Sequence, residues 1–321
     1  MFAVYAAEPN PDDPLAALRV GERPDPQLPE DHVAVTVRAA SLNMHDLWTL
    51  RGVGIKPDQF PMILGCDGAG VLVDGSDVVI YPVVSSQGWM GDETLDPRRT
   101  LLTEKLQGSF ADTVVLPQRN VLPKPAGLTF PEAACMGTAW LTAYRMLFVK
   151  SGLRPGQTML VQGASGGVAT ALVQLGRAAG MRVWVTGRTE QKRELAAELG
   201  AHDTFEPGVR LPERVDAVFE TVGKATWSHS ATSLKPGGII VCSGATSGDA
   251  DRAELQRLFF LQLRMVGSTM GTREELAGLL SFLDLTGVRP QIGTELPMAQ
   301  AEQGFKAMLD GDTAGKVVFT R

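Results

Sequence analysis

The chain has 321 residues, of which 44% are hydrophobic and 21% charged, so it is long enough for two domains with substantial cores. Its formal net charge is −6, and no cluster of Lys and Arg offsets this acidity. We therefore expect neither nucleic acid nor an anionic membrane surface as a partner. The sequence shows no leader pattern and no apolar run long enough to span a membrane, which predicts a cytoplasmic protein.

The first third of the chain has the pattern of strands and turns. Residues 32–40 alternate apolar and polar side chains, short β-branched runs follow at 70–73 and 77–84, and Gly and Pro separate them. This pattern predicts an antiparallel β domain. Residues 81–107 are polar and without periodicity, so we expect an exposed lobe there. A helical stretch should begin within residues 123–134.

From Thr158 onward, β-branched runs alternate with amphipathic helical patterns, which predicts a parallel, doubly wound sheet. The final segment, 315–321 (GKVVFTR), is rich in β-branched and aromatic residues. We expect it to form a strand that rejoins the first domain.

A glycine-rich turn at 163–167 is the strongest local signal. A predicted strand ends at Gly163, and a helix with an apolar face begins near Gly167. Gly163 permits a tight turn, Gly166 and Gly167 allow the backbone to approach a pyrophosphate, and Ala169 permits close helix packing. The helix N-terminus would bind the anion. A dinucleotide site is therefore predicted, with Ser165 and Val168 also in the turn.

The sequence favours NADP(H) over NAD(H). About 20 residues after the turn, NAD-binding folds usually carry an acidic residue for the ribose hydroxyls, but this chain has TGRTEQK. Gly187 leaves room there, and Arg188, Thr189 and Lys192 supply a planar cation, a hydroxyl and an ammonium group suited to a 2′-phosphate. The alternative is that Arg188 and Lys192 are solvated charges at the start of a helix.

The order of motifs resembles the medium-chain dehydrogenase/reductase superfamily, in particular its zinc-free quinone oxidoreductase-like branch. The matching stretches include SLNMHDLWTLRG, PMILGCDGAGVL, GASGGVATALVQLGRAAG, LKPGGIIVCSG and GKVVF. The resemblance implies an α/β protein with a GroES-like β-rich catalytic domain at 1–124, completed by 269–321. It implies a Rossmann domain with a doubly wound parallel sheet at 125–268. Relatives are usually dimers or tetramers, so we expect a homodimer.

The resemblance also adds cofactor contacts outside the glycine turn and the TGRT segment. It places one near the nicotinamide and the others on loops of the Rossmann domain. These residues are Thr142, Gly223, Gly244, Ala245, Ser268 and Thr269. Each could instead be an ordinary loop residue.

No metal is expected. Zinc-dependent alcohol dehydrogenases of this superfamily carry a cysteine where Asn43 stands, a His-Glu pair where Cys66 and Asp67 stand, and another cysteine near Thr138. Their second, four-cysteine zinc site would fall within 81–107, which has no cysteine. A makeshift site that uses His45 is the weaker alternative. The three cysteines, with no ligand-like spacing, are interpreted as free thiols.

Without a Lewis acid, reduction of an activated C=C bond or a quinone is easier than oxidation of an alcohol, because hydrogen-bond donors can stabilise the oxygen charge that develops. In the family's N-x-x-D turn, Asn43 would be the amide donor, and Asp46 would orient the turn or relay a proton. The alternative is that Asn43 and Asp46 only form a hydrogen-bonded turn that fixes the domain's own loop. Two other functions stay open: an NADPH-binding redox sensor or structural protein, and a zinc-independent alcohol dehydrogenase.

Overall fold

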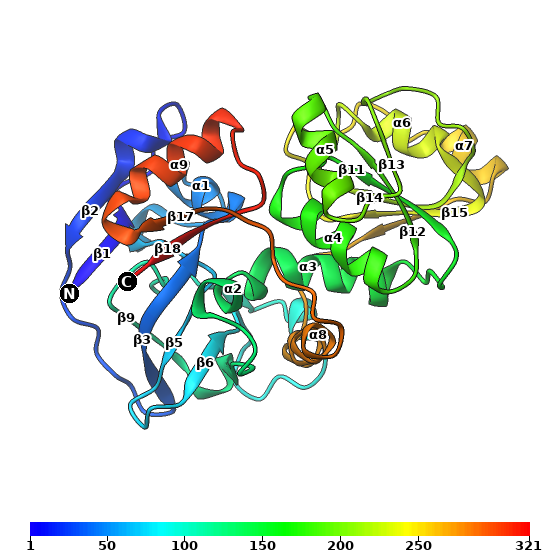
Figure 1. Ribbon diagram of the computed structural model, residues 1–321. Coiled ribbons are helices and arrows are strands. Elements are labelled where there is room, and N and C mark those ends of the chain that lie inside the picture. Colours follow the sequence, from blue (N-terminus) through cyan, green and yellow to red (C-terminus); the bar gives the residue numbers. More distant parts are fainter. The chain divides into compact units, whose positions relative to one another are not determined.

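The computed structural model describes residues 1–321, and the chain divides into two compact units. Unit 1 comprises Met1–Leu141 and Gly271–Arg321, and unit 2 comprises Thr142–Met270. Both are drawn in Figure 1. None of the helices combines the length and the apolar character that a membrane crossing requires.

Unit 1 is built on a seven-stranded sheet in the order β10-β6-β5-β3-β18-β17, with β9 also paired to β3. Residues 32–40, whose side chains alternate between apolar and polar, lie in β3. The last strand, β18, rejoins unit 1 as expected, and it pairs antiparallel with β3 (Figure 1). All pairs in this sheet are antiparallel except β17 with β18. The strands are β1 (Phe2–Ala6), β2 (Leu18–Glu22), β3 (His32–Ser41), β4 (Met62–Ile63), β5 (Ala69–Val71), β6 (Asp77–Ile80), β7 (Val83–Val84), β8 (Thr100–Leu101), β9 (Thr113–Pro117), β10 (Val121–Pro123), β17 (Ile292–Pro297) and β18 (Lys316–Thr320).

Unit 1 also contains four α-helices, and a fifth lies at its boundary with unit 2. A capping box starts α2, in which Thr129 Oγ1 accepts from Glu132 N and the Glu132 carboxylate accepts from Thr129 N. This α2 lies in the helical stretch that the sequence predicts. The helices are α1 (Met44–Leu50), α2 (Phe130–Ala134), α8 (Arg273–Thr286) and α9 (Ala301–Asp310), and α3 (Leu141–Tyr144) spans the division between the units.

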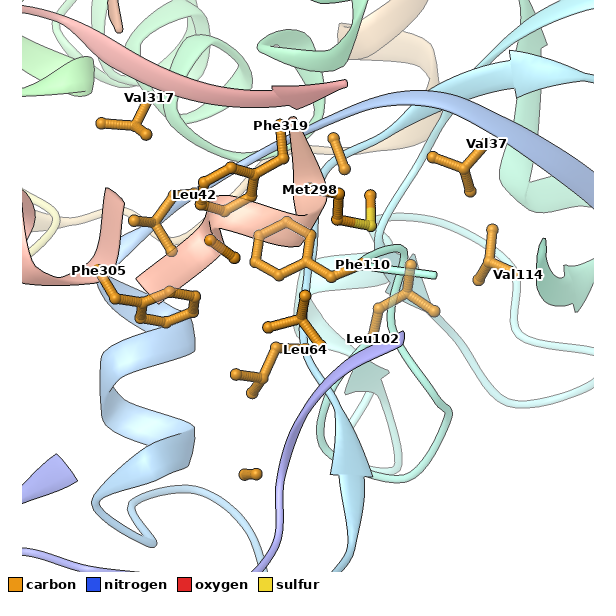
Figure 2. Packing of buried hydrophobic residues seen from close by; sticks show 14 of the residues in the cluster. Val37, Leu42, Leu64, Leu102, Phe110, Val114, Met298, Phe305, Val317 and Phe319 are labelled. Atoms are coloured by element: carbon orange, nitrogen blue, oxygen red, sulfur yellow. The ribbon is translucent and has the colours of Figure 1, made fainter. Parts of the chain in front are cut away.

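Three aromatic rings brought together from distant parts of the sequence lie in the core of unit 1 (Figure 2). The ring of Phe110 meets that of Phe319 edge to face at 5.1 Å and that of Phe305 at 6.2 Å. All three side chains are fully buried. Such pairs contribute about 0.5–1.5 kcal/mol beyond the burial of their area. The C-terminal segment is therefore part of the core of unit 1.

The prediction of an exposed lobe at 81–107 is wrong for residues 81–83 and 100–103, which are largely buried. Tyr81 is buried and donates its hydroxyl hydrogen to Gly271 O at 2.8 Å, and Leu102 lies in the core (Figure 2). The segment folds without periodicity because its polar groups bond each other: Asp96 Oδ2 accepts from both Ser86 N and Ser86 Oγ at 2.6 Å. The exposed residues of the segment lie mainly between 87 and 99, among them Met90 and Leu95.

Unit 2 contains a six-stranded parallel sheet in the order β13-β12-β11-β14-β15-β16, as predicted. The order reverses at β11, so right-handed crossovers place α4 and α5 on the opposite face from α6. The elements are β11 (Thr158–Gln162), α4 (Gly167–Ala178), β12 (Arg182–Thr186), α5 (Glu190–Glu198), β13 (Asp203–Phe205), β14 (Val215–Glu220), α6 (Trp227–Thr232), β15 (Leu234–Cys242), α7 (Leu255–Phe260) and β16 (Arg264–Gly267).

Candidate active site

The glycine turn of unit 2 has the geometry of an anion cradle. Gly163 has a left-handed backbone, with φ of +94°, and its N–H donates to Thr186 Oγ1 at 3.3 Å. Gly166 precedes the first residue of α4, and a Cβ atom added to it would meet nothing within 4 Å. The backbone there is open to a ligand at the N-terminus of a 12-residue helix. Both features fit the pyrophosphate of a dinucleotide.

A second polar group follows β12. A Cβ added to Gly187 would lie 2.9 Å from Arg193 Cγ and 3.1 Å from Ala164 Cβ, so glycine lets this turn lie close to the glycine turn. Arg188 is exposed and has no carboxylate partner. Thr189 caps α5 by accepting from Lys192 N at 3.4 Å. The Arg188 guanidinium is therefore available to an anion at this strand end.

Arg193 is a residue that the sequence analysis missed. Its guanidinium donates to Gly187 O at 2.8 Å and pairs with Glu190 at 2.7 Å. It fixes the turn that carries Arg188. Nothing in the motif pattern distinguishes it from a solvated helix charge.

The remaining loop residues expected to contact the cofactor follow β14, β15 and β16. Gly223 has φ of +87°, and an added Cβ would lie 2.9 Å from Ala245 Cα, so two of these loops touch. Ser268 N donates to Cys242 O at 2.8 Å, beside Thr269. Gly244 lies in the same loop as Ala245, two residues after β15 ends.

The carboxyl ends of parallel strands share one edge of a sheet. The predicted cofactor residues that follow β11, β12, β14, β15 and β16 therefore lie along the same edge. In open α/β sheets, ligands bind at this edge near the point where the strand order reverses. That point lies at β11, which ends in the glycine turn. Thr142 is the exception, since it lies in α3, ahead of the first strand of unit 2.

In unit 1, a buried lysine holds the N-x-x-D turn. The ammonium of Lys316, on β18, donates to Leu42 O at 2.9 Å and Asn43 Oδ1 at 2.6 Å, and lies 3.5 Å from Asp67 Oδ2. Asn43 gives its own amide hydrogens to Asp67 Oδ2 at 2.9 Å and to Ser41 O at 3.1 Å. All the hydrogen-bonding atoms of the Asn43 amide are thus engaged within unit 1.

Asp46 stabilises the same turn through its two carboxylate oxygens. Oδ2 accepts from Asn43 N at 2.9 Å, and Oδ1 accepts from Gly65 N at 2.8 Å. The side chain is fully buried, and this burial raises the pKa of Asp46 to about 7. In this structure Asp46 orients the turn and the loop before Asp67.

Three buried polar atoms of the residues around the N-x-x-D turn have no hydrogen-bond partner. They are His45 Nε2, Asp67 Oδ1 and Thr138 Oγ1. A Cβ added to Gly137, which precedes Thr138, would lie 2.9 Å from Asp67 Oδ1. Burial lowers the pKa of His45, so its ring favours the neutral form. Unsatisfied groups of this kind are candidates for water or for a substrate.

The residues at the position that zinc ligands occupy in metal-dependent relatives do not fit a zinc ion. Cys66 donates its S–H to Leu102 O at 3.4 Å, and burial raises the pKa of this thiol well above its ordinary value, which disfavours the thiolate that zinc requires. The Lys316 ammonium already neutralises Asp67. The structure contains no group of three His, Cys, Asp or Glu side chains that could hold a metal.

We predict that Asp46→Asn changes the pH dependence of stability. The folded-state pKa of about 7 exceeds the ordinary value of 3.8, so from about pH 4 to pH 7 the folded protein keeps a proton that the unfolded chain has lost. The wild type should therefore lose stability relative to Asp46→Asn as pH rises through this window, by up to roughly 4 kcal/mol. Denaturant unfolding at a series of pH values measures the difference.

Asp74→Asn is the control, because Asp74 is exposed and hydrogen bonds to Ser76 lower its pKa. A constant difference between wild type and Asp46→Asn across pH 4–8 would contradict the prediction.

Two family models match this chain. The alcohol dehydrogenase GroES-like domain matches residues 29–126, and the zinc-binding dehydrogenase domain matches residues 167–284. The quinone oxidoreductase of Mus musculus is 26% identical over 309 residues, which cover 91% of this chain and 90% of that protein. The acryloyl-coenzyme A reductase of Sulfurisphaera tokodaii is 26% identical, covering 95% and 97%.

A crystal structure of an NAD-dependent alcohol dehydrogenase superposes with a TM-score of 0.92 at 31% identity, and the match covers 100% of both chains. Together with the GroES-like unit and the six-stranded parallel sheet, these matches confirm the fold and the kinship that the motifs predict. The chain is an oxidoreductase of the medium-chain dehydrogenase/reductase superfamily.

Proposed function

We propose that the protein is an NADPH-dependent reductase that transfers hydride to an activated C=C bond or a quinone without a metal ion. One observation carries the proposal: Lys316 supplies positive charge to the polar turn where zinc ligands stand in metal-dependent relatives. The names of the quinone oxidoreductase and acryloyl-coenzyme A reductase relatives agree with this class of reaction.

The preference for NADPH is supported by the residues after β12. Gly187 and Arg188 stand directly after the strand, where NAD-binding folds carry an acidic residue for the ribose hydroxyls, and the exposed Arg188 guanidinium has no carboxylate partner. A guanidinium binds a phosphate through two parallel hydrogen bonds. The set proposed to hold the cofactor is Thr142, Gly163, Ser165, Gly166, Gly167, Val168, Gly187, Arg188, Thr189, Lys192, Gly223, Gly244, Ala245, Ser268 and Thr269.

NADPH should bind at least about ten times more tightly than NADH, because only NADPH carries the 2′-phosphate. Arg188→Ala should weaken NADPH binding by roughly 1–3 kcal/mol and leave NADH binding nearly unchanged. Fluorescence titrations with both cofactors measure this. Arg38→Ala, at another exposed arginine, is the control. Equal dissociation constants for the two cofactors in the wild type would contradict the proposed preference.

On the substrate side, Asn43 is the proposed donor. Bound NADPH would supply the hydride, and charge would then develop on the conjugated oxygen of the substrate. That oxygen would replace Ser41 O, which accepts the longer of the two bonds from the Asn43 amide. The Lys316 ammonium at Oδ1 polarises this amide and so strengthens its N–H donors. Asp46 keeps the backbone of Asn43 in place.

We predict that Asn43→Ala lowers turnover of a quinone or enone by about ten- to a thousandfold, the effect of losing one oxyanion donor, with little change in NADPH affinity. Chelators should leave the wild-type rate unchanged. Steady-state assays with a panel of quinones, enones and aldehydes measure both effects.

Asn120→Ala is a matched control, because Asn120 is also a buried amide of unit 1 but donates only to Tyr81 O and Val83 O. It should affect stability more than turnover. Activity abolished by chelation and restored by zinc would refute the metal-free proposal, and full activity in Asn43→Ala would leave Asn43 as a turn residue only.

An alcohol dehydrogenase is the second candidate, favoured by the 31% identical structure of an NAD-dependent alcohol dehydrogenase. The same panel separates the two. Faster oxidation of alcohols with NAD⁺ than reduction of quinones and enones with NADPH would select this alternative.

We also propose a homodimer, located in the cytoplasm as the sequence analysis expects. Strand β16 ends the six-stranded sheet with one side unpaired, and Leu255, Phe259 and Phe260 of the neighbouring α7 are 66–80% exposed. An unpaired edge beside an apolar patch is suited to a second copy of the same chain.

Phe259→Lys combined with Phe260→Ser should convert the dimer to a monomer, because charge replaces the apolar patch. Light scattering coupled to size exclusion measures the mass. Leu285→Ser, at an exposed leucine of unit 1, is the control and should stay dimeric. A monomeric wild type at micromolar concentration would contradict the dimer.

A further inference from the structure

A surface cavity of unit 2 gathers three arginines. It has a volume of about 440 Å³ and lies between the loop that follows β13, the helix α6 and the helix α7. Arg210 and Arg214 reach it from the loop, and Arg257 reaches it from α7. A cavity of this size accommodates a small organic molecule.

These three guanidinium groups form no ion pair with any carboxylate. The one acidic residue in the wall, Glu213, is bonded to Arg182. Three like charges around one cavity repel each other, and an anion placed among them would remove that cost. The whole chain is acidic, with 36 Asp and Glu against 30 Lys and Arg, so this positive cluster does not reflect a generally basic surface.

The loop that forms one wall of the cavity is anchored at two points, Leu211 and Val209. Leu211 anchors the loop in the core of unit 2, between Arg210 and Arg214. His229 Nδ1 faces the Gln162 amide nitrogen at 2.9 Å and therefore accepts a hydrogen, so Nε2 carries the proton and donates it to Val209 O at 2.8 Å. A loop fixed at both points loses little conformational entropy when a ligand binds.

The cavity is distinct from the proposed cofactor site and from the proposed dimer surface. No residue of the proposed cofactor set lines the cavity. None of the three apolar residues of α7 lines the cavity, and around the helix Arg257 lies about 160° from Leu255 and Phe259 and about 60° from Phe260. Leu255 and Phe259 can therefore be covered by a second copy while Arg257 stays open.

We propose that this cavity is a second anion site, which binds a small molecule that carries at least two phosphate charges. Planar guanidinium groups match phosphate oxygens in pairs, and two or three of them suit a diphosphate or a phosphate monoester better than a single carboxylate. The site does not depend on which substrate the enzyme reduces.

Calorimetric titration of the full chain, saturated with NADPH, with inorganic pyrophosphate tests the proposal. We expect saturable binding of one pyrophosphate per chain that weakens about tenfold in Arg257→Gln and again in Arg210→Gln, because each variant removes a charge-assisted hydrogen bond. Arg38→Gln, an exposed arginine of unit 1, should bind as the wild type does. All three positions have exposed or half-buried side chains, so unchanged melting temperatures will verify folding.

Two further measurements locate the anion. Arg188→Gln should leave pyrophosphate binding unchanged, which separates this cavity from the proposed cofactor site. Pyrophosphate should also protect Arg210, Arg214 and Arg257 from phenylglyoxal, as read by mass spectrometry. A heat of binding that does not saturate with pyrophosphate concentration would overturn the proposal. Equal binding in all variants, or loss of binding in Arg188→Gln alone, would also overturn it.

Discussion

The buried ammonium group of Lys316 is the charge on which the polar centre of unit 1 depends. It joins the last strand of the sheet to the start of α1 and to the loop that carries Asp67, through one backbone carbonyl, one amide and one carboxylate. A buried charge is tolerated only when it is paired and hydrogen bonded, and removal of one partner leaves the other uncompensated. The geometry of Asn43 therefore cannot be separated from the packing of β18.

The same ammonium lies where the donor set of a zinc site stands in metal-dependent relatives. A cation fixed by the fold supplies positive charge near the polar turn, and the neutral thiol of Cys66 remains a packing residue. The charge of Lys316 acts through the amide of Asn43, so its effect on a substrate would be weaker than direct coordination by a metal. Under the proposed function, this would limit the chemistry to substrate oxygens that already delocalise charge.

Much of unit 2 could be predicted from the sequence because its signals are local. The glycine turn, the strand before it and α4 lie within 21 consecutive residues, and each strand and helix carries its own periodicity. The contacts of Asn43 could not be predicted, because Lys316 is 273 residues away and nothing in the sequence marks it as buried. The buried parts of the 81–107 segment could not be predicted either, because hydrogen bonds, not apolar periodicity, determine its fold.

Because β18 is both the last strand of the chain and an inner strand of the sheet in unit 1, the order of synthesis matters for folding. All of unit 2 leaves the ribosome before Lys316 and Phe319 are made, so its parallel sheet can form during translation. Unit 1, although its synthesis begins first, must wait. Until the final residues emerge, β3 and β17 lack the strand between them, Phe110 lacks one of its two aromatic partners, and Asp67 has no counter-charge.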